Sequence, residues 1–275
     1  MDNLPIIGII AGSGNLPAQL IETCEKNSRD FFIIAFEESF SHEIMAHLPH
    51  AIVRLGEVGK ALEHLRNAGV KQVVMAGGLK RPSLSSIKPD AAGALLLKKL
   101  GKAFFFGDDA LLKAVTSFFE EEGFQVIGAE EILGGLLANE GILGKIKPDK
   151  SASADILTGM VAAKNLGALD IGQAVIVDSG IVIGTETAEG TDELIERCKK
   201  QTIAKTRTGV LVKAKKPTQE TRVDLPSIGV ATIENLYNAG FAGVAIEAGA
   251  SLLIEKDKLI KKANEYGLFV VGVKL

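Results

Sequence analysis

The stretch that decides the fold is Pro5-Ile-Ile-Gly-Ile-Ile-Ala-Gly-Ser-Gly-Asn-Leu-Pro17. Its first half is apolar throughout, which is typical of a strand buried on both faces of a sheet. A Gly-Ser-Gly turn at 12–14 follows, and Asn15 or Ser13 can cap a helix whose first turn tolerates a proline. A buried strand, a glycine turn and a helix in this order predict the first unit of a Rossmann-like parallel sheet.

The pattern continues for about half of the chain. Apolar runs predict further strands at 31–36, 52–55, 70–76 and 124–127, and helical spacing predicts helices at 58–68, within 89–107 and over 108–123. Strands that are apolar throughout and alternate with helices indicate a parallel sheet covered on both faces. We therefore expect a Rossmann-like domain over residues 1–133.

The alternation of apolar runs and helical segments is interrupted after residue 133. Glycines punctuate 134–150, which ends in Lys147-Pro148-Asp149, and we expect the interdomain linker there. In 151–275, Asp178-Ser179-Gly180 between two apolar runs predicts a β-hairpin, and three strands at 210–214, 243–246 and 268–273 alternate with helices. The chain is thus expected to be an α/β protein, with a parallel-sheet N-terminal domain and a second, mixed α/β C-terminal domain.

Composition excludes several classes of protein. Of the 275 residues, 47% are hydrophobic and 24% charged, which excludes wholesale disorder. The net charge of −3 and the 5% of aromatic residues disfavour nucleic-acid binding. The uninterrupted apolar runs are too short for a transmembrane helix, and the two cysteines are too few for a disulfide framework. We expect a cytoplasmic protein.

The glycine turn is the first candidate site. Gly12, Ser13 and Gly14 can bring backbone N–H groups to a phosphate at the start of a helix. The spacing is G-x-G-x-x-P and not the dinucleotide fingerprint G-x-G-x-x-G, so a tight structural turn is the competing interpretation. Lys80 and Arg81 follow another strand, where their charges suit a phosphate.

Two acidic motifs open predicted helices. Asp108 and Asp109 follow a glycine, where one aspartate serves as a helix cap and the other is available for a ligand. The second motif comprises Glu189, Gly190, Thr191 and Asp192, with Thr191 expected as the cap. For both motifs, simple capping is the alternative to substrate binding.

The densest polar run spans 213–229. It contains Lys213, Gln219 and Arg222, which suit phosphate or sugar groups, and Asp224, which can hold Mg²⁺ or orient water. Pro226 restricts the backbone just after this aspartate. The alternative is a solvated loop, which is the usual meaning of a charged run. Motifs for P-loop nucleotide binding, for a serine nucleophile elbow and for a zinc protease helix do not occur.

These motifs together resemble one known family. The glycine turn at 12–17, the Gly-Asp-Asp-Ala-Leu-Leu run at 107–112, Leu169-Asp-Ile-Gly-Gln173, the motif at 189–192 and the long run at 213–229 are similar to the two-domain, non-calcineurin-like UDP-2,3-diacylglucosamine pyrophosphatases of lipid A biosynthesis. The resemblance covers nearly the whole chain. The Arg-x-Asp-Leu-Pro motif, which holds the essential aspartate of that family, places this role on Asp224.

The resemblance implies an enzyme, a hydrolase that acts on a phosphoric anhydride. The expected reaction is Mg²⁺- or Mn²⁺-dependent cleavage of UDP-2,3-diacylglucosamine to UMP and 2,3-diacylglucosamine 1-phosphate. It implies a Rossmann-like N-terminal domain and catalysis centred on Asp224, which either holds the metal or positions water. It leaves room for peripheral contact with the inner membrane and for a homodimer.

Two other functions compete with this expectation. An NAD(P)-dependent oxidoreductase would use the glycine turn, with Glu37 gripping a ribose, but Pro17 departs from that pattern. A non-catalytic protein that binds a sugar nucleotide or lipid would bind ligand without turnover. An assay of the reaction with and without Asp224 separates these alternatives.

Overall fold

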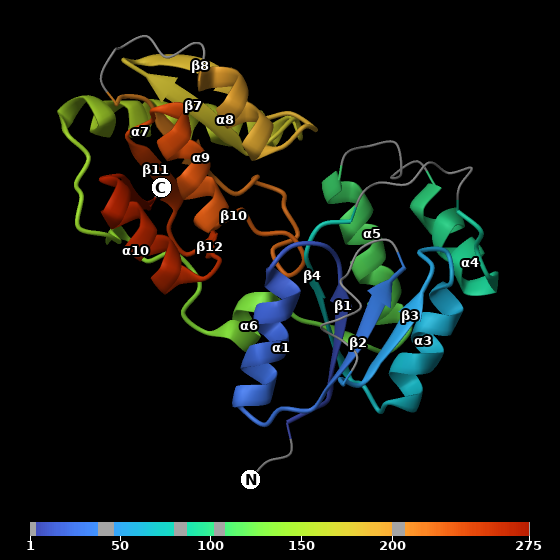
Figure 1. Cartoon of the computed structure of the whole chain (residues 1–275). Coiled ribbons are helices and arrows are strands. Elements are labelled where there is room, and N and C mark those ends of the chain that lie inside the picture. Colours follow the sequence, from blue (N-terminus) through green and yellow to red (C-terminus); the bar gives the residue numbers. More distant parts are fainter. Residues whose placement is uncertain (1–3, 38–46, 80–86, 102–107, 200–206, 275) are drawn as a thin grey trace. The chain divides into compact units, whose positions relative to one another are not determined.

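The computed structural model describes residues 4–37, 47–79, 87–101, 108–199 and 207–274, drawn in colour in Figure 1. They form two compact units. The N-terminal unit comprises Met1–Gly134 and Glu220–Asp224, and the C-terminal unit comprises Gly135–Gln219 and Leu225–Leu275. The segment Glu220–Asp224 therefore belongs to the N-terminal unit, although it lies within the sequence range expected for the C-terminal domain.

The N-terminal unit is built on a five-stranded parallel sheet of order β3-β2-β1-β4-β5. Its strands are β1 (Ile7–Ala11), β2 (Phe31–Phe36), β3 (His50–Val53), β4 (Gln72–Ala76) and β5 (Gln125–Val126). All five residues of β1 are buried, as a central strand requires. The direction in which strands are added reverses between β1 and β4, which confirms the Rossmann-like expectation.

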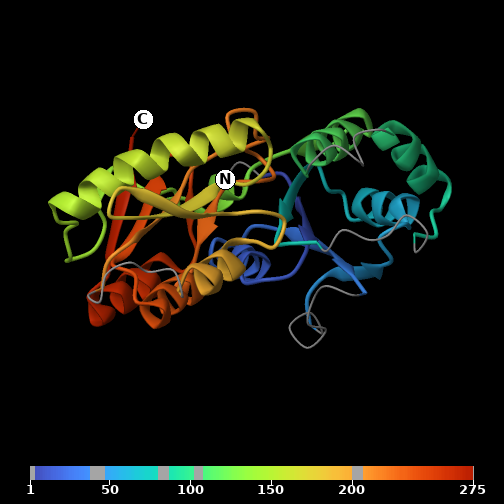
Figure 2. The same ribbon diagram turned by 90° about the horizontal axis from the view of Figure 1, so that it is seen from above.

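Helices cover both faces of this sheet (Figures 1 and 2). On one face, α1 (Leu16–Lys26) and α6 (Ala129–Leu133) bury Leu20, Cys24 and Ile132 against the strands. The other face packs against α3 (Val58–Asn67), α4 (Ala91–Leu100) and α5 (Asp108–Glu121). This arrangement leaves the carboxyl ends of the strands at one edge, where the candidate glycine turn lies.

The C-terminal unit contains a mixed six-stranded sheet of order β6-β13-β11-β9-β7-β8. The strands are β6 (Gly141–Ile142), β7 (Ala174–Asp178), β8 (Ile181–Thr185), β9 (Val210–Lys213), β11 (Gly243–Glu247) and β13 (Phe269–Val273). β9, β11 and β13 are parallel, whereas β6, β7 and β8 pair antiparallel with their neighbours. The predicted hairpin is β7–β8, and its Ser179 and Gly180 both have positive φ.

Helices also cover both faces of the second sheet. α7 (Lys150–Ala168) lies on one face, and its Gly159 approaches Val212 so closely that a Cβ there would lie 2.4 Å from Val212 Cγ2. α8 (Thr191–Lys199), α9 (Val230–Ala239) and α10 (Lys256–Tyr266) pack on the other face. Two short strands, β10 (Ser227–Ile228) and β12 (Leu252–Leu253), pair in parallel. β10 precedes α9, and β12 precedes α10. β6 was not expected, because it lies inside the predicted linker.

Among the described residues, none of the helices combines the length and the apolar character that crossing a bilayer requires.

Candidate active site

The glycine turn is bonded to the end of β4. Gly12 N–H donates to the carbonyl of Ala76 at 2.8 Å, and Ser13 N–H donates to the carbonyl of Gly78 at 2.8 Å. The Ser13 hydroxyl donates to the same Gly78 oxygen at 2.9 Å, and Gly78 N–H returns a bond to Ser13 O at 3.0 Å. Two backbone amides expected to face a phosphate are therefore engaged within the protein.

The glycines are explained by this close approach. A Cβ on Gly12 would lie 2.6 Å from Gly78 O, so no larger residue fits without moving the backbone. Gly14 differs, because it is exposed and adopts a φ of +95° with open space around it. α1 begins at Leu16 after Asn15, whose side chain makes no capping hydrogen bond. Lys80 and Arg81 lie outside the described residues.

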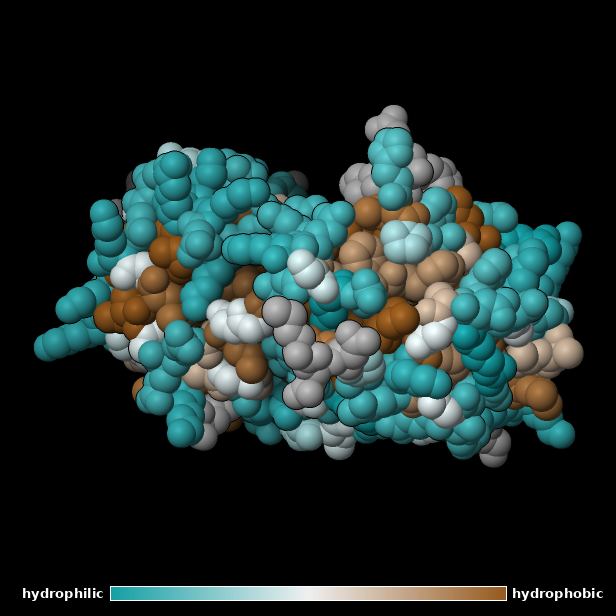
Figure 3. All heavy atoms as spheres, turned by 90° about the horizontal axis from the view of Figure 1, so that it is seen from below, coloured by the Kyte–Doolittle hydropathy of each residue, from teal (hydrophilic) through white to brown (hydrophobic). Residues whose placement is uncertain are grey.

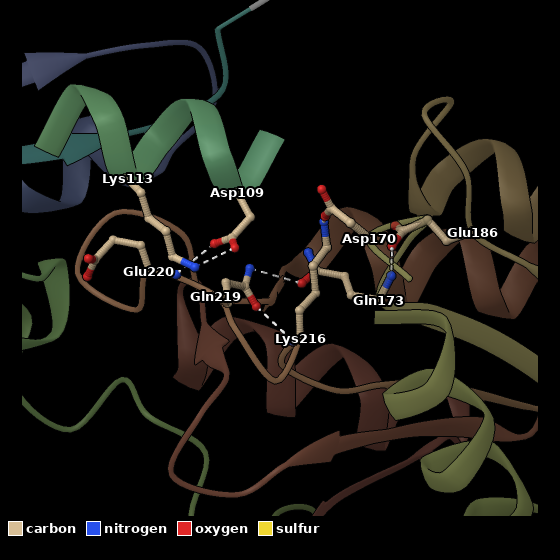
Figure 4. Close-up of polar contacts among 8 residues, drawn as sticks. All are labelled: Asp109, Lys113, Asp170, Gln173, Glu186, Lys216, Gln219 and Glu220. Carbon is tan, nitrogen blue, oxygen red and sulfur yellow. Dashed lines mark hydrogen bonds and ion pairs between the residues drawn. The ribbon is translucent and has the colours of Figure 1, made fainter. Parts of the chain in front are cut away.

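The segment Glu220–Asp224 lies along helix α5 in the N-terminal unit (Figure 4). The backbone N–H of Glu220 donates to Asp109 Oδ1 at 3.0 Å, and Lys113 donates to Asp109 Oδ2 at 2.7 Å. Asp109 is only 8% exposed, so its carboxylate is buried between these two donors. Of the predicted Asp108–Asp109 pair, Asp109 anchors this segment, while nothing is described of the Asp108 side chain.

Arg222 forms the electrostatic centre of the segment. Its Nε and Nη2 each donate to a carboxylate oxygen of Glu220 at 2.9 Å, and its Nη1 donates to Glu120 Oε1 at 2.6 Å. The hydrogen bonds from Arg222 lower the pKa of Glu220, and those to Glu220 and Glu120 raise the pKa of Arg222. Asp109, Lys113 and Glu120 recur at a spacing that places them on one face of α5.

Asp224 closes this segment. Its backbone N–H donates to the carbonyl of Glu220 at 3.0 Å, which forms a one-turn loop, and its side chain is partly exposed. The preceding Val223 packs against the apolar cluster of Phe118 and Phe119. The hydrogen bond to Glu220 constrains the backbone before Asp224, whereas the restriction expected from Pro226 after it stays a prediction.

Lys213 is a buried cation of the C-terminal unit. It ends β9 and is 7% exposed. Its ammonium donates to the hydroxyl of Thr191 at 3.0 Å and to the carbonyl of Ser227 at 3.1 Å, and both acceptors are formally neutral. Thr191 begins α8 and Ser227 lies just before α9, so the ammonium contacts the N-terminal ends of two helices, where anions are favoured.

Buried polar side chains continue from Thr191 through this unit. The hydroxyl of Thr191 donates to Glu186, which is 6% exposed and also accepts from Gln173 N–H at 2.9 Å. Gln219 Nε2 donates to Gln173 Oε1 at 3.2 Å, and Gln219 Oε1 accepts from Lys216 N–H at 2.9 Å (Figure 4). Three predicted residues, Lys213, Thr191 and Gln219, thus belong to one hydrogen-bonded network.

Sequence reasoning missed part of this network and misassigned one residue. Glu186 went unnoticed, although it directly follows β8 and precedes Thr191 by five positions. Thr191 was expected to cap α8, but it is the first helical residue, and its hydroxyl bonds to Glu186 and Lys213. The Thr191 hydroxyl accepts from the buried ammonium of Lys213, which needs hydrogen-bond acceptors, and so it does not serve as the helix cap.

The other members of the acidic motif lie at the surface. Glu189 is exposed and pairs with Arg197 at 2.8 Å, while Asp192 is exposed and accepts from Asn235 at 2.9 Å. Gly190 has a φ of +90°, which favours glycine at this turn. The structure therefore brings Thr191 into the network and leaves Glu189 and Asp192 in surface contacts.

No preformed metal cage occurs in the described part of the chain, where no three His, Cys, Asp or Glu side chains gather as potential ligands. Mg²⁺, however, commonly binds to one or two carboxylates and completes its shell with water and substrate phosphates. The partly exposed carboxylate of Asp224 suits that second mode. Each unit thus offers one element for phosphate chemistry: a carboxylate in the N-terminal unit and a buried cation in the C-terminal unit.

Comparison with known proteins gives matches along the chain. Residues 6–136 match the family described as the LpxI N-terminal domain, and residues 139–271 match the LpxI C-terminal domain. The chain is 43% identical over 272 residues to the UDP-2,3-diacylglucosamine pyrophosphatase LpxI of Caulobacter vibrioides, covering 97% of both chains.

Similarity to solved structures is weak. An NAD-dependent epimerase/dehydratase from Methylobacillus flagellatus has a TM-score of 0.31 at 12% identity, with 98% of this chain and 88% of that chain covered. N5-carboxyaminoimidazole synthase from Aspergillus clavatus has a TM-score of 0.26 at 14% identity, with 74% and 45% covered.

Proposed function

The chain belongs to the LpxI family of UDP-2,3-diacylglucosamine pyrophosphatases, and on that premise we propose that it hydrolyses UDP-2,3-diacylglucosamine in lipid A biosynthesis. Water adds to one phosphorus and a P–O bond of the anhydride breaks, so that UMP and 2,3-diacylglucosamine 1-phosphate each keep one phosphate. The observation that carries this proposal is the 43% identity to the Caulobacter enzyme over 97% of both chains.

Two described residues suit different parts of this chemistry. Anhydride cleavage depends on neutralising phosphate charge and aligning water more than on a covalent nucleophile. Lys213 supports the first task, because its buried ammonium bonds to neutral acceptors at the ends of two helices. Asp224 supports the second, as a partly exposed carboxylate on a loop closed by its own backbone hydrogen bond.

We propose Mg²⁺, or Mn²⁺ in its place, as the cofactor. Asp224 would hold the ion together with the substrate phosphates, which fits a carboxylate outside any preformed cage. The ion would neutralise charge on the phosphate oxygens. If Asp224 is a metal ligand, excess Mg²⁺ should partly restore Asp224→Asn; if it only aligns water, excess Mg²⁺ should have no such effect.

The acyl chains of the substrate need apolar surface. α4 offers some, since Leu95 is 64% exposed and exposed lysines 98 and 99 follow in its last turn. On the face shown in Figure 3, hydrophobic side chains lie in patches among hydrophilic ones. Exposed leucine beside lysine suits peripheral contact with an anionic membrane, so we propose a cytoplasmic enzyme that touches the inner membrane. We also propose that two copies of this chain form a homodimer.

The test is release of UMP from UDP-2,3-diacylglucosamine by the purified full chain, with Mg²⁺ or with EDTA. We expect metal-dependent release that falls at least ~1000-fold in Asp224→Ala, because the proposed reaction centre would be gone. Asp257→Asn, at an exposed carboxylate in the first turn of α10, is the matched control and should retain activity. A folded wild type that releases no UMP at any metal concentration would overturn the proposal.

The dinucleotide alternative has weak support in the site. The amides of Gly12 and Ser13 bond to Ala76 and Gly78, so they are engaged before any pyrophosphate arrives. Measured hydride transfer to NAD(P)⁺ would support the oxidoreductase alternative. Binding of the sugar nucleotide without turnover, unaffected by Asp224→Ala, would instead favour the non-catalytic protein.

A further inference from the structure

Arg222 faces carboxylates of the protein. Three of the five N–H donors of a guanidinium are used, two on Glu220 and one on Glu120. A phosphate that binds the Nε–Nη2 edge in bidentate fashion would have to displace the charge-assisted bonds to Glu220, which are stronger than neutral ones. The geometry therefore argues against the phosphate contact expected from the sequence and points to a structural task near Asp224.

The four residues before Asp224 are attached to the N-terminal unit at several points. The backbone of Glu220 bonds to the buried Asp109, Arg222 joins Glu220 to Glu120, and Val223 packs against the apolar cluster. Asp224 N–H then donates to the Glu220 carbonyl at 3.0 Å. Whatever fixes Glu220 and Arg222 on α5 thus also fixes the backbone of Asp224.

We propose that Arg222, paired with Glu220 and Glu120, is a positioning residue that holds the carboxylate of Asp224 in place on α5. This inference rests on the proposed function, in which Asp224 acts on the phosphoanhydride. It assigns Glu120, a residue that no motif suggested, to the same task. Arg222 touches the substrate in neither the ground state nor the transition state.

Kinetics of Glu120→Gln separate positioning from phosphate binding. If Arg222 positions Asp224, removing the Glu120 charge loosens the segment, and kcat falls about 10- to 100-fold with KM within about twofold, as expected for small misplacement of a catalytic group. If Arg222 binds phosphate, removing the competing Glu120 carboxylate frees the guanidinium. In that case KM falls or is unchanged, and kcat is unchanged. The two mechanisms thus predict different kinetic parameters to change.

Three further variants and one control variant complete the experiment. Arg222→Gln should match Glu120→Gln, and the double variant should lose little more than either single one, because both remove the same interaction. Arg222→Lys keeps the charge without the planar fork, so its kcat should lie between those of the wild type and Arg222→Gln. The matched control is Glu122→Gln, which breaks an equally short 2.6 Å pair with Arg66 at the end of α5 and should leave kcat and KM unchanged.

Hydrogen exchange gives a readout that does not need activity. The amides of Val223 and Asp224 both donate to the Glu220 carbonyl, at 3.2 and 3.0 Å. A peptide spanning 217–226 should exchange several-fold faster in Glu120→Gln and Arg222→Gln than in Glu122→Gln, with exchange in β1 and β4 unchanged as evidence of folding.

Each result has one meaning. Faster exchange with a selective loss of kcat supports the proposal. Unchanged exchange in the segment, or a rise of KM alone in Arg222→Gln, overturns it. An inactive wild type would overturn the proposed reaction, whereas the exchange data would still decide whether Arg222 and Glu120 hold the segment.

Discussion

At the scale of single residues, the charge of the acceptor distinguishes two buried lysines of the same polar network. Lys216 is 9% exposed and forms an ion pair with Asp170 at 2.6 Å. Lys213 is equally buried, but its acceptors are a hydroxyl and a carbonyl. A buried ammonium is costly unless it is compensated, and the buried carboxylate of Glu186 is linked to Lys213 only through the Thr191 hydroxyl. We therefore expect Lys213 to bind an anionic group of the substrate.

We therefore predict different effects of replacing the two lysines. Lys213→Met should lower kcat/KM for UDP-2,3-diacylglucosamine ~100-fold, which is typical of losing one buried group that stabilises developing charge. Lys216→Met should lower the melting temperature and leave kcat/KM within a few-fold. Steady-state kinetics and thermal unfolding measure both effects. Equal kinetic losses in the two variants would contradict a special role for Lys213.

At the scale of elements, one short string marks two helix starts. Ile-Lys-Pro-Asp occurs at 87–90 and at 146–149. In both copies the aspartate is the N-cap, with φ −75° and ψ −175°, and its carboxylate accepts from the amide three residues later. The distances are 2.7 Å from Gly93 N and 2.8 Å from Ala152 N. The string is thus a local helix-start signal and not a trace of duplicated domains.

Removing these caps should destabilise the two units. Asp149→Ala should cost about 1 kcal/mol, the usual value for an N-cap. Asp90→Ala should cost more, because Asp90 also accepts from Lys60 N–H on α3 at 3.2 Å. Urea unfolding followed by circular dichroism measures both. A smaller loss for Asp90→Ala than for Asp149→Ala would show that the second contact contributes nothing.

At the scale of the whole molecule, charged pairs set the response of the N-terminal unit to acid. Hydrogen bonds from Arg222 lower the pKa of Glu220, and those from Arg54 lower the pKa of Glu57 to about 2. A lowered carboxyl pKa stabilises the fold above the unfolded value of ~4.3, and this contribution is lost as pH falls through the folded value. Burial raises the pKa of Glu130, so this residue favours the folded state as pH falls.

We predict that the urea midpoint of the wild type falls as pH drops from about 5 to 2, the window set by these two carboxylates. Arg222→Gln should flatten the pH dependence, because Glu220 then titrates nearer its ordinary pKa. The unfolding midpoint, recorded at several pH values, tests this. A slope for Arg222→Gln as steep as that of the wild type would show that the Glu220–Arg222 pair does not contribute to acid sensitivity.

Much of the fold could be predicted because it is encoded locally. Apolar runs predicted β2 over its full length, and helical spacing predicted a helix at 58–68, where α3 spans Val58–Asn67. The short strands β6, β10 and β12 could not be found, since two apolar or small residues carry no period and are strands only through their partners. The strand order of the second sheet depends likewise on pairing between distant residues.

The candidate site also combines features that the sequence specifies with features that arise only on folding. The amino-acid sequence specifies which chemical groups are present: a lysine at the end of β9, an aspartate between an arginine and a proline, and glycines where β1 ends. Their partners depend on the folded chain, in which Thr191 donates to Glu186 and Glu220–Asp224 lies along α5, more than a hundred residues away in the sequence. Residue types and spacing specify local conformation, but charge pairing and burial depend on neighbours that only the folded chain brings together.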